Sequence, residues 1–265
     1  TPHQLVMTAT PIPRSLTMSA YADLDTSIID ELPPGRQSIE TVALSNARRD
    51  ELIVKIKKIS KEGRQIYWVC TLIEESEALR AESAEKTFTY LSDNLKDLNV
   101  VMIHGRLTKP EKEIIMSDFE SGKINLLVAT TVIEVGVNVP NASLMIVENS
   151  ERLGLAQLHQ LRGRVGRGSE KSACVLLYQS PLSQTAKERL DILRQSNDGF
   201  LIAQKDLELR GPGEILGTQQ TGVASMKIAN IVRDAYLLKQ TRFYSSKMLE
   251  AENESQNALI NRWID

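Results

Sequence analysis

Two arginines in the segment QLRGRVGRG, residues 160–168, stand at a spacing that could bind a chain of phosphates. Leucines recur at every third position over residues 155–161, which predicts a short helix held against a core by one face. Arg164 and Arg167 are three residues apart, so they project from one face if the turn stays helical, and the glycines give them little side-chain cover. Two permanently charged guanidinium groups suit a polyanion, most naturally a triphosphate. From these residues alone, a solvated basic turn is the alternative.

Threonines follow two apolar runs at places where an open α/β sheet gathers its ligands. Thr8 and Thr10 come after Leu-Val-Met, and Thr130 and Thr131 come after Leu-Leu-Val-Ala. Because ligands bind at the carboxyl ends of parallel strands, these hydroxyls are candidate binding groups. The alternative is that they are ordinary β-branched strand residues with satisfied hydroxyls.

Short apolar runs alternate with segments of helical period, which is typical of a parallel sheet covered by helices. Strands are expected at residues 4–10, 38–45, 64–70, 99–105, 124–131, 143–149 and 172–178. Helices are expected between them at residues 46–61, 76–97, 109–120 and 155–162. After Tyr178 we expect helices only, interrupted by the glycine-rich segment 210–222. The sequence therefore predicts an α/β fold with a helical C-terminal extension.

A Pro-Pro-Gly sequence at residues 33–35 divides the chain, because proline fixes φ and glycine permits a turn. Residues 1–33 hold one expected strand and one expected helix, which are too little for a closed core, so we expect the end of an upstream domain and a linker. Residues 34–182 are expected to form the α/β domain, and residues 183–265 the helical extension.

The composition of the 265-residue chain, with 42% hydrophobic residues, is that of a soluble globular protein. No apolar run reaches the roughly 20 residues that cross a bilayer, so no membrane segment is expected. Cys70 and Cys174 lie far apart in apolar runs, which predicts reduced core thiols in a cytoplasmic protein. The histidines lack ligand spacing, so no metal site is expected. The net charge of −2 argues against a general polycation but leaves room for a local basic surface.

Three strings resemble motifs III, V and VI of superfamily 2 helicases, in matching order and spacing. They are TATPIPR (8–14), VATTVIEVGVNVP (128–140) and QLHQLRGRVGRG (157–168). More narrowly, AYADLDTSIIDELPPGR (20–36) and DGFLIAQKDLELRGPGEILGTQQTG (198–222) resemble the RecG family of bacterial ATP-dependent DNA helicases. The transcription-repair coupling factor shares the second of these strings but not the DELPPGR linker.

The resemblance implies a RecA-like parallel sheet flanked by helices, which is the second motor lobe of a superfamily 2 helicase. The implied activity is ATP-dependent translocation on double-stranded DNA that remodels stalled forks and Holliday-type junctions in recombination and repair. The implied partners are branched DNA and, in the same chain, a first helicase lobe and a DNA-recognition wedge domain, in a cytoplasmic monomer. A noncatalytic nucleic-acid-binding or protein-interaction module, and the motor lobe of a coupling factor, are the alternatives.

The resemblance also assigns roles to residues on the nucleotide side. Arg164 and Arg167 match arginine fingers, which reach across a cleft to the γ-phosphate of ATP bound on the first lobe. Further nucleotide-side positions fall on Glu134, Gly136, Asn138 and Gln160. Relatives often have an aspartate where Asn138 stands, and asparagine keeps the acceptor but loses the charge. ATP and Mg²⁺ are implied for the full-length protein, held mainly by the first lobe.

The remaining implied roles concern DNA and its coupling to hydrolysis. Thr130, Thr131 and His104 match positions near the DNA backbone, where contacts position the duplex without identifying its sequence. A satisfied structural histidine is the alternative for His104. The positions implied in coupling and translocation are Thr8, Thr10, Arg189, Arg210 and Gln220. Arg189 and Arg210 match hairpin residues that tie this motif together by hydrogen bonds.

The 265 residues contain no G-x-x-x-x-G-K-[ST] phosphate loop, and their two Asp-Glu pairs do not stand in a strand-end magnesium context. Without a phosphate cradle and a magnesium ligand, nothing holds ATP for the arginines to act on. We therefore expect the isolated chain to show no measurable ATPase activity, with or without forked DNA, in a phosphate-release assay. Robust turnover would contradict the assignment of the main nucleotide contacts to another lobe.

Overall fold

A computed structural model describes residues 5, 27–29, 31, 36–71, 77–130, 139–168, 170–210 and 234–250. Packing divides the chain into two compact units, which are described separately. The first, called the sheet unit below, comprises Glu31–Asp198, and the second comprises Thr1–Asp30 with Gly199–Asp265. The domain boundaries expected after residues 33 and 182 stay predictions.

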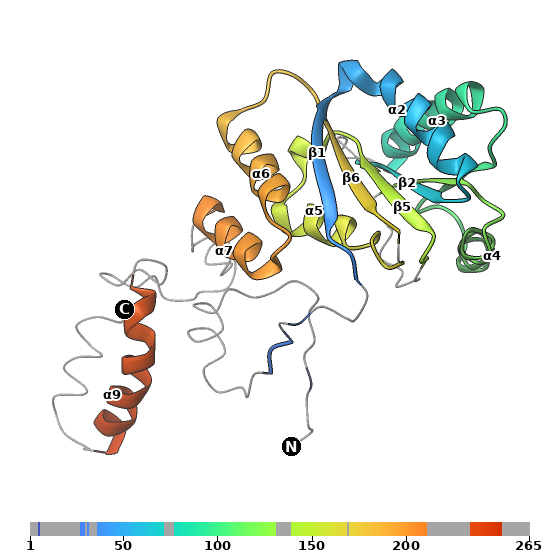
Figure 1. Cartoon of the computed structure of the whole chain (residues 1–265). Helices are drawn as coiled ribbons and strands as arrows, with labels where there is room; N and C mark the ends of the chain where they lie inside the picture. The colour runs from blue at the N-terminus through green and yellow to red at the C-terminus, as the bar shows by residue number, and fades with distance from the viewer. Residues whose placement is uncertain are drawn as a thin grey trace. The chain divides into compact units, whose positions relative to one another are not determined.

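The sheet unit is built on six parallel strands in the described part of the chain (Figure 1). They are β1 (Ile39–Ser45), β2 (Gln65–Cys70), β3 (Val100–Ile103), β4 (Leu126–Thr130), β5 (Ala142–Val147) and β6 (Ser172–Tyr178). Their order across the sheet is β1-β6-β5-β2-β4-β3, and every pair of neighbours is parallel. The six strands expected from residue 38 onward are confirmed. The strand expected at residues 4–10 lies outside the described residues, apart from Leu5.

The strands in the middle of the sheet are buried on both faces, which explains why their sequences are continuous apolar runs. Every residue of β2, β4 and β5 is buried. In β2, Tyr67 stands beside Leu127 of β4 and Met145 of β5 in the register. The strand order therefore places β2 at the centre, with the ends of β4 and β5 on either side of its own.

Helices follow the strands in the expected alternation. In the sheet unit they are η1 (Asn46–Arg48), α2 (Arg49–Lys61), α3 (Glu77–Asn94), α4 (Lys109–Glu120), η2 (Ser150–Arg152), α5 (Leu155–Arg162) and α6 (Gln184–Gln195). Side-chain caps fix two of the starts: the carboxylate of Glu111 accepts the Thr108 N–H at 2.7 Å, and Ser183 Oγ accepts the Ala186 N–H at 3.2 Å.

The core is divided between the two faces of the sheet because successive strand residues point in opposite directions. On one face, α2 and α3 pack apolar residues such as Ile56 and Leu91 against Ile66 and Trp68 of β2. Tyr67, between those two strand residues, meets Phe119 of α4 edge to face at 4.8 Å between ring centroids. Tyr67 therefore belongs to the other face.

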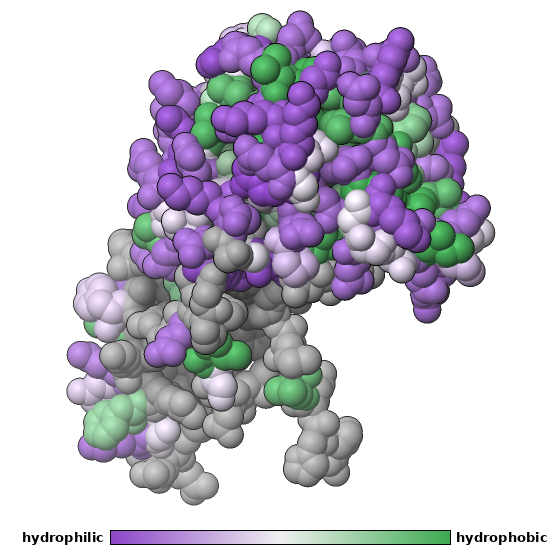
Figure 2. Space-filling model, turned by 45° about the vertical axis from the view of Figure 1, so that its right-hand side comes forward, coloured by the Kyte–Doolittle hydropathy of each residue, from purple (hydrophilic) through white to green (hydrophobic). Residues whose placement is uncertain are grey.

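The surface of the sheet unit is mostly hydrophilic in the view of Figure 2, with apolar residues scattered between charged ones. Val54 of α2 and Ile114 of α4 are examples, with 72% and 63% of their surface exposed. The second unit contributes α7 (Gly199–Arg210), η3 (Ala235–Leu237) and α9 (Leu238–Glu250). Among the described helices, none combines the length and the apolar character that crossing a membrane requires.

Candidate nucleotide and nucleic-acid sites

The two candidate arginines lie in a tight turn that follows α5. Helix α5 ends at Arg162, as expected, and its leucines are buried against the sheet. The turn continues with N–H bonds from residue 164 to the Leu161 carbonyl and from residue 165 to the Arg162 carbonyl. Gly166 then adopts a left-handed φ of 77°. The helix does not continue through the turn, so the condition under which Arg164 and Arg167 would share one helical face is not met.

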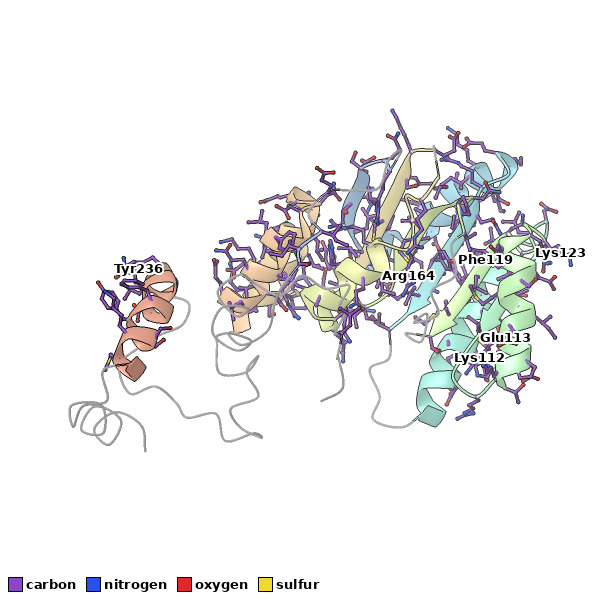
Figure 3. The ribbon with its side chains drawn as sticks, turned by 90° about the horizontal axis from the view of Figure 1, so that it is seen from below. Lys112, Glu113, Phe119, Lys123, Arg164 and Tyr236 are labelled. Carbon is purple, nitrogen blue, oxygen red and sulfur yellow. The ribbon has the colours of Figure 1, made fainter. Side chains whose placement is uncertain are left out.

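The positive charges of both guanidinium groups influence the hydroxyl of Tyr67 on β2. Burial raises the pKa of Tyr67 to about 12, and the positive charges of Arg164 and Arg167 oppose that rise. Arg164 is half-buried and Arg167 is exposed. Figure 3 shows Arg164 on the α5 side of the sheet unit, apart from the charged residues Lys112, Glu113 and Lys123 around α4.

Glycine is required in this turn because other parts of the chain press against it. A Cβ atom on Gly166 would lie 2.8 Å from Cγ1 of Ile39, the first residue of β1. A Cβ atom on Gly168 would lie 2.5 Å from the carbonyl oxygen of Pro140, just before β5. The turn is thus fitted between the segments that enter β1 and β5. The sequence indicates that the glycines leave the arginines with little side-chain cover, and the structure adds that Gly166 and Gly168 permit this close approach.

These contacts also locate the turn at the amino edge of the sheet, where the strands begin. The rule that ligands gather at the carboxyl ends of strands therefore does not describe the arginines. Helix α5 starts on the carboxyl side, after β5 and η2, and ends at the amino edge. The helix thus connects the two edges.

Arg162, the first arginine of the sequence motif, has a structural role. It is 2% exposed, and its Nη1 donates to the carbonyls of Leu193 and Ser196 at 2.8 Å each. Its Nη2 lies 2.9 Å from Nδ1 of His159. Burial first, and then the charges of Arg162 and Arg36, lower the pKa of His159 to about 4. His159 is therefore neutral near pH 7, and its Nδ1 can accept from Arg162.

Arg36, the last residue of the DELPPGR linker, joins the arginines of the turn, although no role was expected for it from the sequence. Its Nη2 donates to the Gly163 carbonyl at 3.2 Å, and Nε of Arg167 donates to the same oxygen at 3.3 Å. Burial, and after it the charge of Arg167, lower the pKa of Arg36. The ion pairs found among the described residues include none of Arg36, Arg164 and Arg167. The turn therefore presents positive charge without a carboxylate counterion in that part of the chain.

His104 and Thr130 lie together at the opposite, carboxyl edge. Ile103 of β3 pairs with Ala129 of β4, so the next residue of each strand is at the same level. Thr130 is 5% exposed, and His104 is half-buried with a buried Nδ1 that has no hydrogen-bond partner among the described residues. The two residues form a polar corner where β3 and β4 end.

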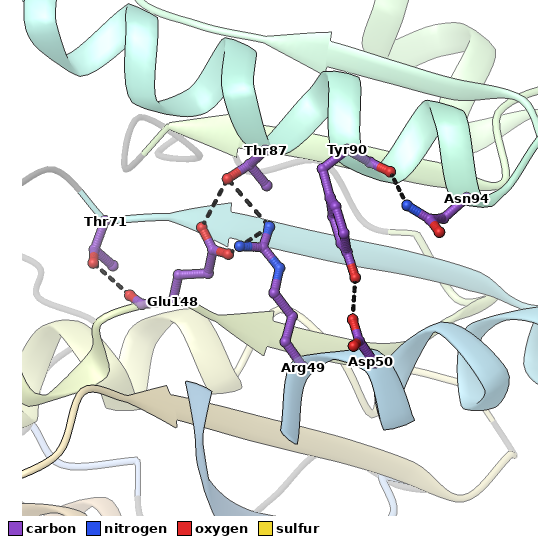
Figure 4. A network of polar contacts seen from close by, with 7 residues as sticks. All are labelled: Arg49, Asp50, Thr71, Thr87, Tyr90, Asn94 and Glu148. Carbon is purple, nitrogen blue, oxygen red and sulfur yellow. Dashed lines mark hydrogen bonds and ion pairs between the residues drawn. The ribbon is translucent and has the colours of Figure 1, made fainter. Parts of the chain in front are cut away.

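A buried polar network holds the neighbouring strand ends, and it is drawn in Figure 4. Glu148, directly after β5, places Oε1 2.9 Å from Nη2 of Arg49 in an ion pair. Its Oε2 accepts from the Thr87 hydroxyl at 3.2 Å, and its backbone carbonyl accepts from the Thr71 hydroxyl after β2. The Arg49 guanidinium also lies over the ring of Trp68 at 5.1 Å. The network ties α2, α3, β2 and β5 together at the carboxyl edge.

Sequence patterns missed this network because its charged members stand in unrelated segments. The only signal was a glutamate at the end of an apolar run, and that signal does not name a partner. Arg189, which the resemblance assigned to the helical hairpin, contacts the same edge. Its two Nη atoms donate to the carbonyls of Glu151 and Leu153 at 2.7 and 2.9 Å. It therefore holds the segment between η2 and α5.

Most of the other sequence-predicted residues fall outside the described part of the chain. Gln160 is exposed on α5, and Arg210 is the last residue of α7, with a side chain outside the description. The positions that fall outside the described residues are Thr8, Thr10, Thr131, Glu134, Gly136, Asn138 and Gln220. Their roles stay predictions.

Known families match most of this chain. The helicase conserved C-terminal domain matches residues 48–169, and domain 3, C-terminal, of ATP-dependent DNA helicase RecG matches residues 196–262. The ATP-dependent DNA helicase RecG of Escherichia coli (strain K12) is 60% identical over 264 residues, which are 99% of this chain and 38% of the relative. The chain belongs to the RecG family.

Other RecG relatives also match most of the chain. The RecG helicase of Bacillus subtilis (strain 168) is 44% identical over 252 residues, which cover 95% of this chain and 37% of that protein. A solved structure of RecG bound to a three-way DNA junction superposes with a TM-score of 0.69 and 43% identity, over 87% of this chain and 30% of that one. The sheet unit is a RecA-like helicase C-terminal lobe, and the chain spans 38% of the length of the Escherichia coli relative.

Glu148→Ala should destabilise the chain strongly, because it leaves the Arg49 guanidinium partly buried without its counterion. We expect a loss of about 3 kcal/mol in the free energy of unfolding, measured by urea denaturation. Glu51→Ala is the matched control, since Glu51 pairs with Arg48 at the surface and both side chains are more than half exposed. A Glu148 variant as stable as the control would show that the network contributes nothing to folding.

Gly166→Ala should test the packing of the turn. The left-handed φ alone costs about 1 kcal/mol, and the contact with Ile39 should raise the total to roughly 2–4 kcal/mol. Gly122→Ala is the control, because Gly122 has a φ of 82° but no heavy atom within 4 Å of an added Cβ. Equal losses of unfolding free energy in the two variants would mean that β1 does not constrain the turn.

Proposed function

We propose that this chain supplies the second motor lobe of an ATP-dependent double-stranded-DNA translocase that remodels stalled forks and Holliday-type junctions. The carrying observation is the turn after α5, which holds Arg164 and Arg167 without a carboxylate counterion among the described residues. The relatives named above are ATP-dependent DNA helicases, and one solved RecG is bound to a three-way DNA junction. These facts support ATP as the anion and branched DNA as the substrate.

Arg164 and Arg167 act in this proposal as fingers on the γ-phosphate. Negative charge develops on the transferred phosphoryl group, and a guanidinium placed there stabilises the transition state. The exposed Arg167 is suited to leave its backbone contact and reach an anion, while Arg164 is half-buried. Gln160, Glu134, Gly136 and Asn138 complete the nucleotide side.

ATP and Mg²⁺ are held mainly by the first lobe of the full-length protein. The chemistry of the turn fits the phosphates, since guanidinium groups bind phosphate oxygens in pairs. It does not fit the metal, because no group of three or more His, Cys, Asp or Glu side chains comes together among the described residues. When bound, Mg²⁺ would supply positive charge that offsets the negative charge of the phosphates. The role of this lobe is to place positive charge on the far side of the triphosphate.

DNA contacts belong to the carboxyl edge in this proposal. Thr130, Thr131 and His104 would offer hydroxyl and imidazole donors to phosphate oxygens, which position a duplex without reading its bases. The His104 side chain is half-buried, so part of it is open to such a contact.

Coupling between the nucleotide and the DNA is assigned to Thr8, Thr10, Arg189, Arg210 and Gln220. Of these, Arg189 has a described contact with the start of the segment that leads into α5. The wedge domain and first lobe are partners within one cytoplasmic, monomeric chain. The domains are residues 1–33, 34–182 and 183–265.

Arg167→Ala in the full-length protein should lower kcat for DNA-stimulated ATP hydrolysis by about three orders of magnitude and leave ATP affinity within a few-fold. Arg164→Ala should behave similarly. Turnover and nucleotide binding are measured separately on one forked substrate. Arg48→Ala is the control, because Arg48 is an exposed arginine paired with Glu51. Lost affinity with unchanged turnover would assign the arginines to ground-state binding instead.

A further inference from the structure

The Gly163 carbonyl is shared by two guanidinium groups that come from distant parts of the chain. Arg36 stands 127 residues away in sequence, just before β1, and donates through Nη2 at 3.2 Å. Arg167 donates from within the turn through Nε at 3.3 Å. Gly163 caps α5, and carbonyls at the end of a helix lack partners inside the helix and favour a nearby cation. One guanidinium group would be enough to give the Gly163 carbonyl a hydrogen-bond partner.

The two donors differ in how firmly they are held. Arg167 is exposed, whereas Arg36 is half-buried in the segment that packs on the turn. That segment is fitted against Gly166, where an added Cβ would meet Ile39 at 2.8 Å and the Gln37 carbonyl at 3.5 Å. Arg36 therefore moves with the turn as one packed piece, and Arg167 is the donor that is free to exchange partners.

The charges also favour Arg167 as the group that leaves the Gly163 carbonyl and Arg36 as the group that stays. Two guanidinium groups on one carbonyl repel each other, and no carboxylate among the described residues pairs with either. An anion that draws Arg167 away relieves this repulsion. When Arg167 leaves, Arg36 still satisfies the Gly163 carbonyl, so the end of α5 keeps its partner.

We propose that Arg36 is a positioning residue for the arginine finger Arg167. It holds the Gly163 carbonyl, and with it the shape of the turn, while Arg167 exchanges that carbonyl for a phosphate oxygen of the nucleotide. Its own charge disfavours the resting contact of Arg167 and so favours the exchange. This inference rests on the function proposed above, in which Arg167 acts on the triphosphate.

The test uses the full-length protein with two substitutions at this position. Arg36→Gln should lower kcat for ATP hydrolysis about tenfold and leave KM for ATP within twofold, because the finger is misplaced only in the transition state. Arg36→Lys keeps the charge and a donor, so it should recover most of the lost turnover. Arg64→Gln is the matched control: Arg64 donates to the Lys171 carbonyl at 3.0 Å, outside the turn, and its loss should leave kcat within twofold.

A double-mutant cycle decides whether Arg36 works through Arg167. In a protein that already carries Arg167→Ala, adding Arg36→Gln should change kcat by less than twofold, since the group that Arg36 positions is gone. A further tenfold loss in that background would overturn the proposal and leave the proposed function intact. A fall in the melting temperature that Arg36→Lys does not repair, with kcat unchanged, would also overturn it and leave only a helix cap. Normal turnover in Arg167→Ala itself would sink the finger assignment, and this inference with it.

Discussion

No β-carbon fits at two positions of the turn after α5, and the arrangement of the candidate nucleotide site depends on that constraint. Gly166 accepts the side chain of Ile39, and Gly168 accepts the carbonyl of Pro140, so the turn is fixed against the segments that enter β1 and β5. Arg164 and Arg167 take their places from this fit, as does Arg36, which arrives with β1. The arginines are thus positioned by packing of their glycine neighbours, more than by the helix that precedes them.

The sequence predicted the strands and helices, which depend on local patterns of residues. Apolar runs of strand length and helical periods gave the strands from residue 38 onward and the helices between them, because a buried parallel sheet leaves a continuous apolar signature. It did not predict which arginine is structural: Arg162 carries the same charge as Arg164, but only folding brings the carbonyls of Leu193 and Ser196 to it. Two further contacts were not predicted for the same reason: the ion pair of Glu148 with Arg49 and the hydrogen bond of Arg36 to Gly163. Each joins residues that are distant in sequence, and the local sequence around one gives no sign of the other.

The two candidate sites occupy opposite edges of one sheet. His104 and Thr130 lie where strands end, and the arginine turn lies where strands begin, with α5 leading from one side to the other. Contacts from Arg189 fix the segment before α5, and contacts from Arg162 fix its end to the last turn and C-cap of α6. A helix clamped at both ends moves as a rigid body, which is the kind of element that could relate a nucleotide at one edge to DNA at the other.

The position of β1 has a consequence for how this lobe folds during synthesis. β1 comes first in the chain among the described strands, yet its partner in the described sheet is β6, which comes last. The strands β2 to β5 can pair as soon as residue 147 has left the ribosome, whereas β1 must wait for residues 172–178. Closing the long loop between β1 and β6 costs conformational entropy before the contacts between these strands can form. This pair of strands therefore forms late. The cluster that contains Arg36 and the Gly163 carbonyl is therefore completed only at the end of folding. A partly synthesised lobe forms most of its sheet before its arginine finger is in position.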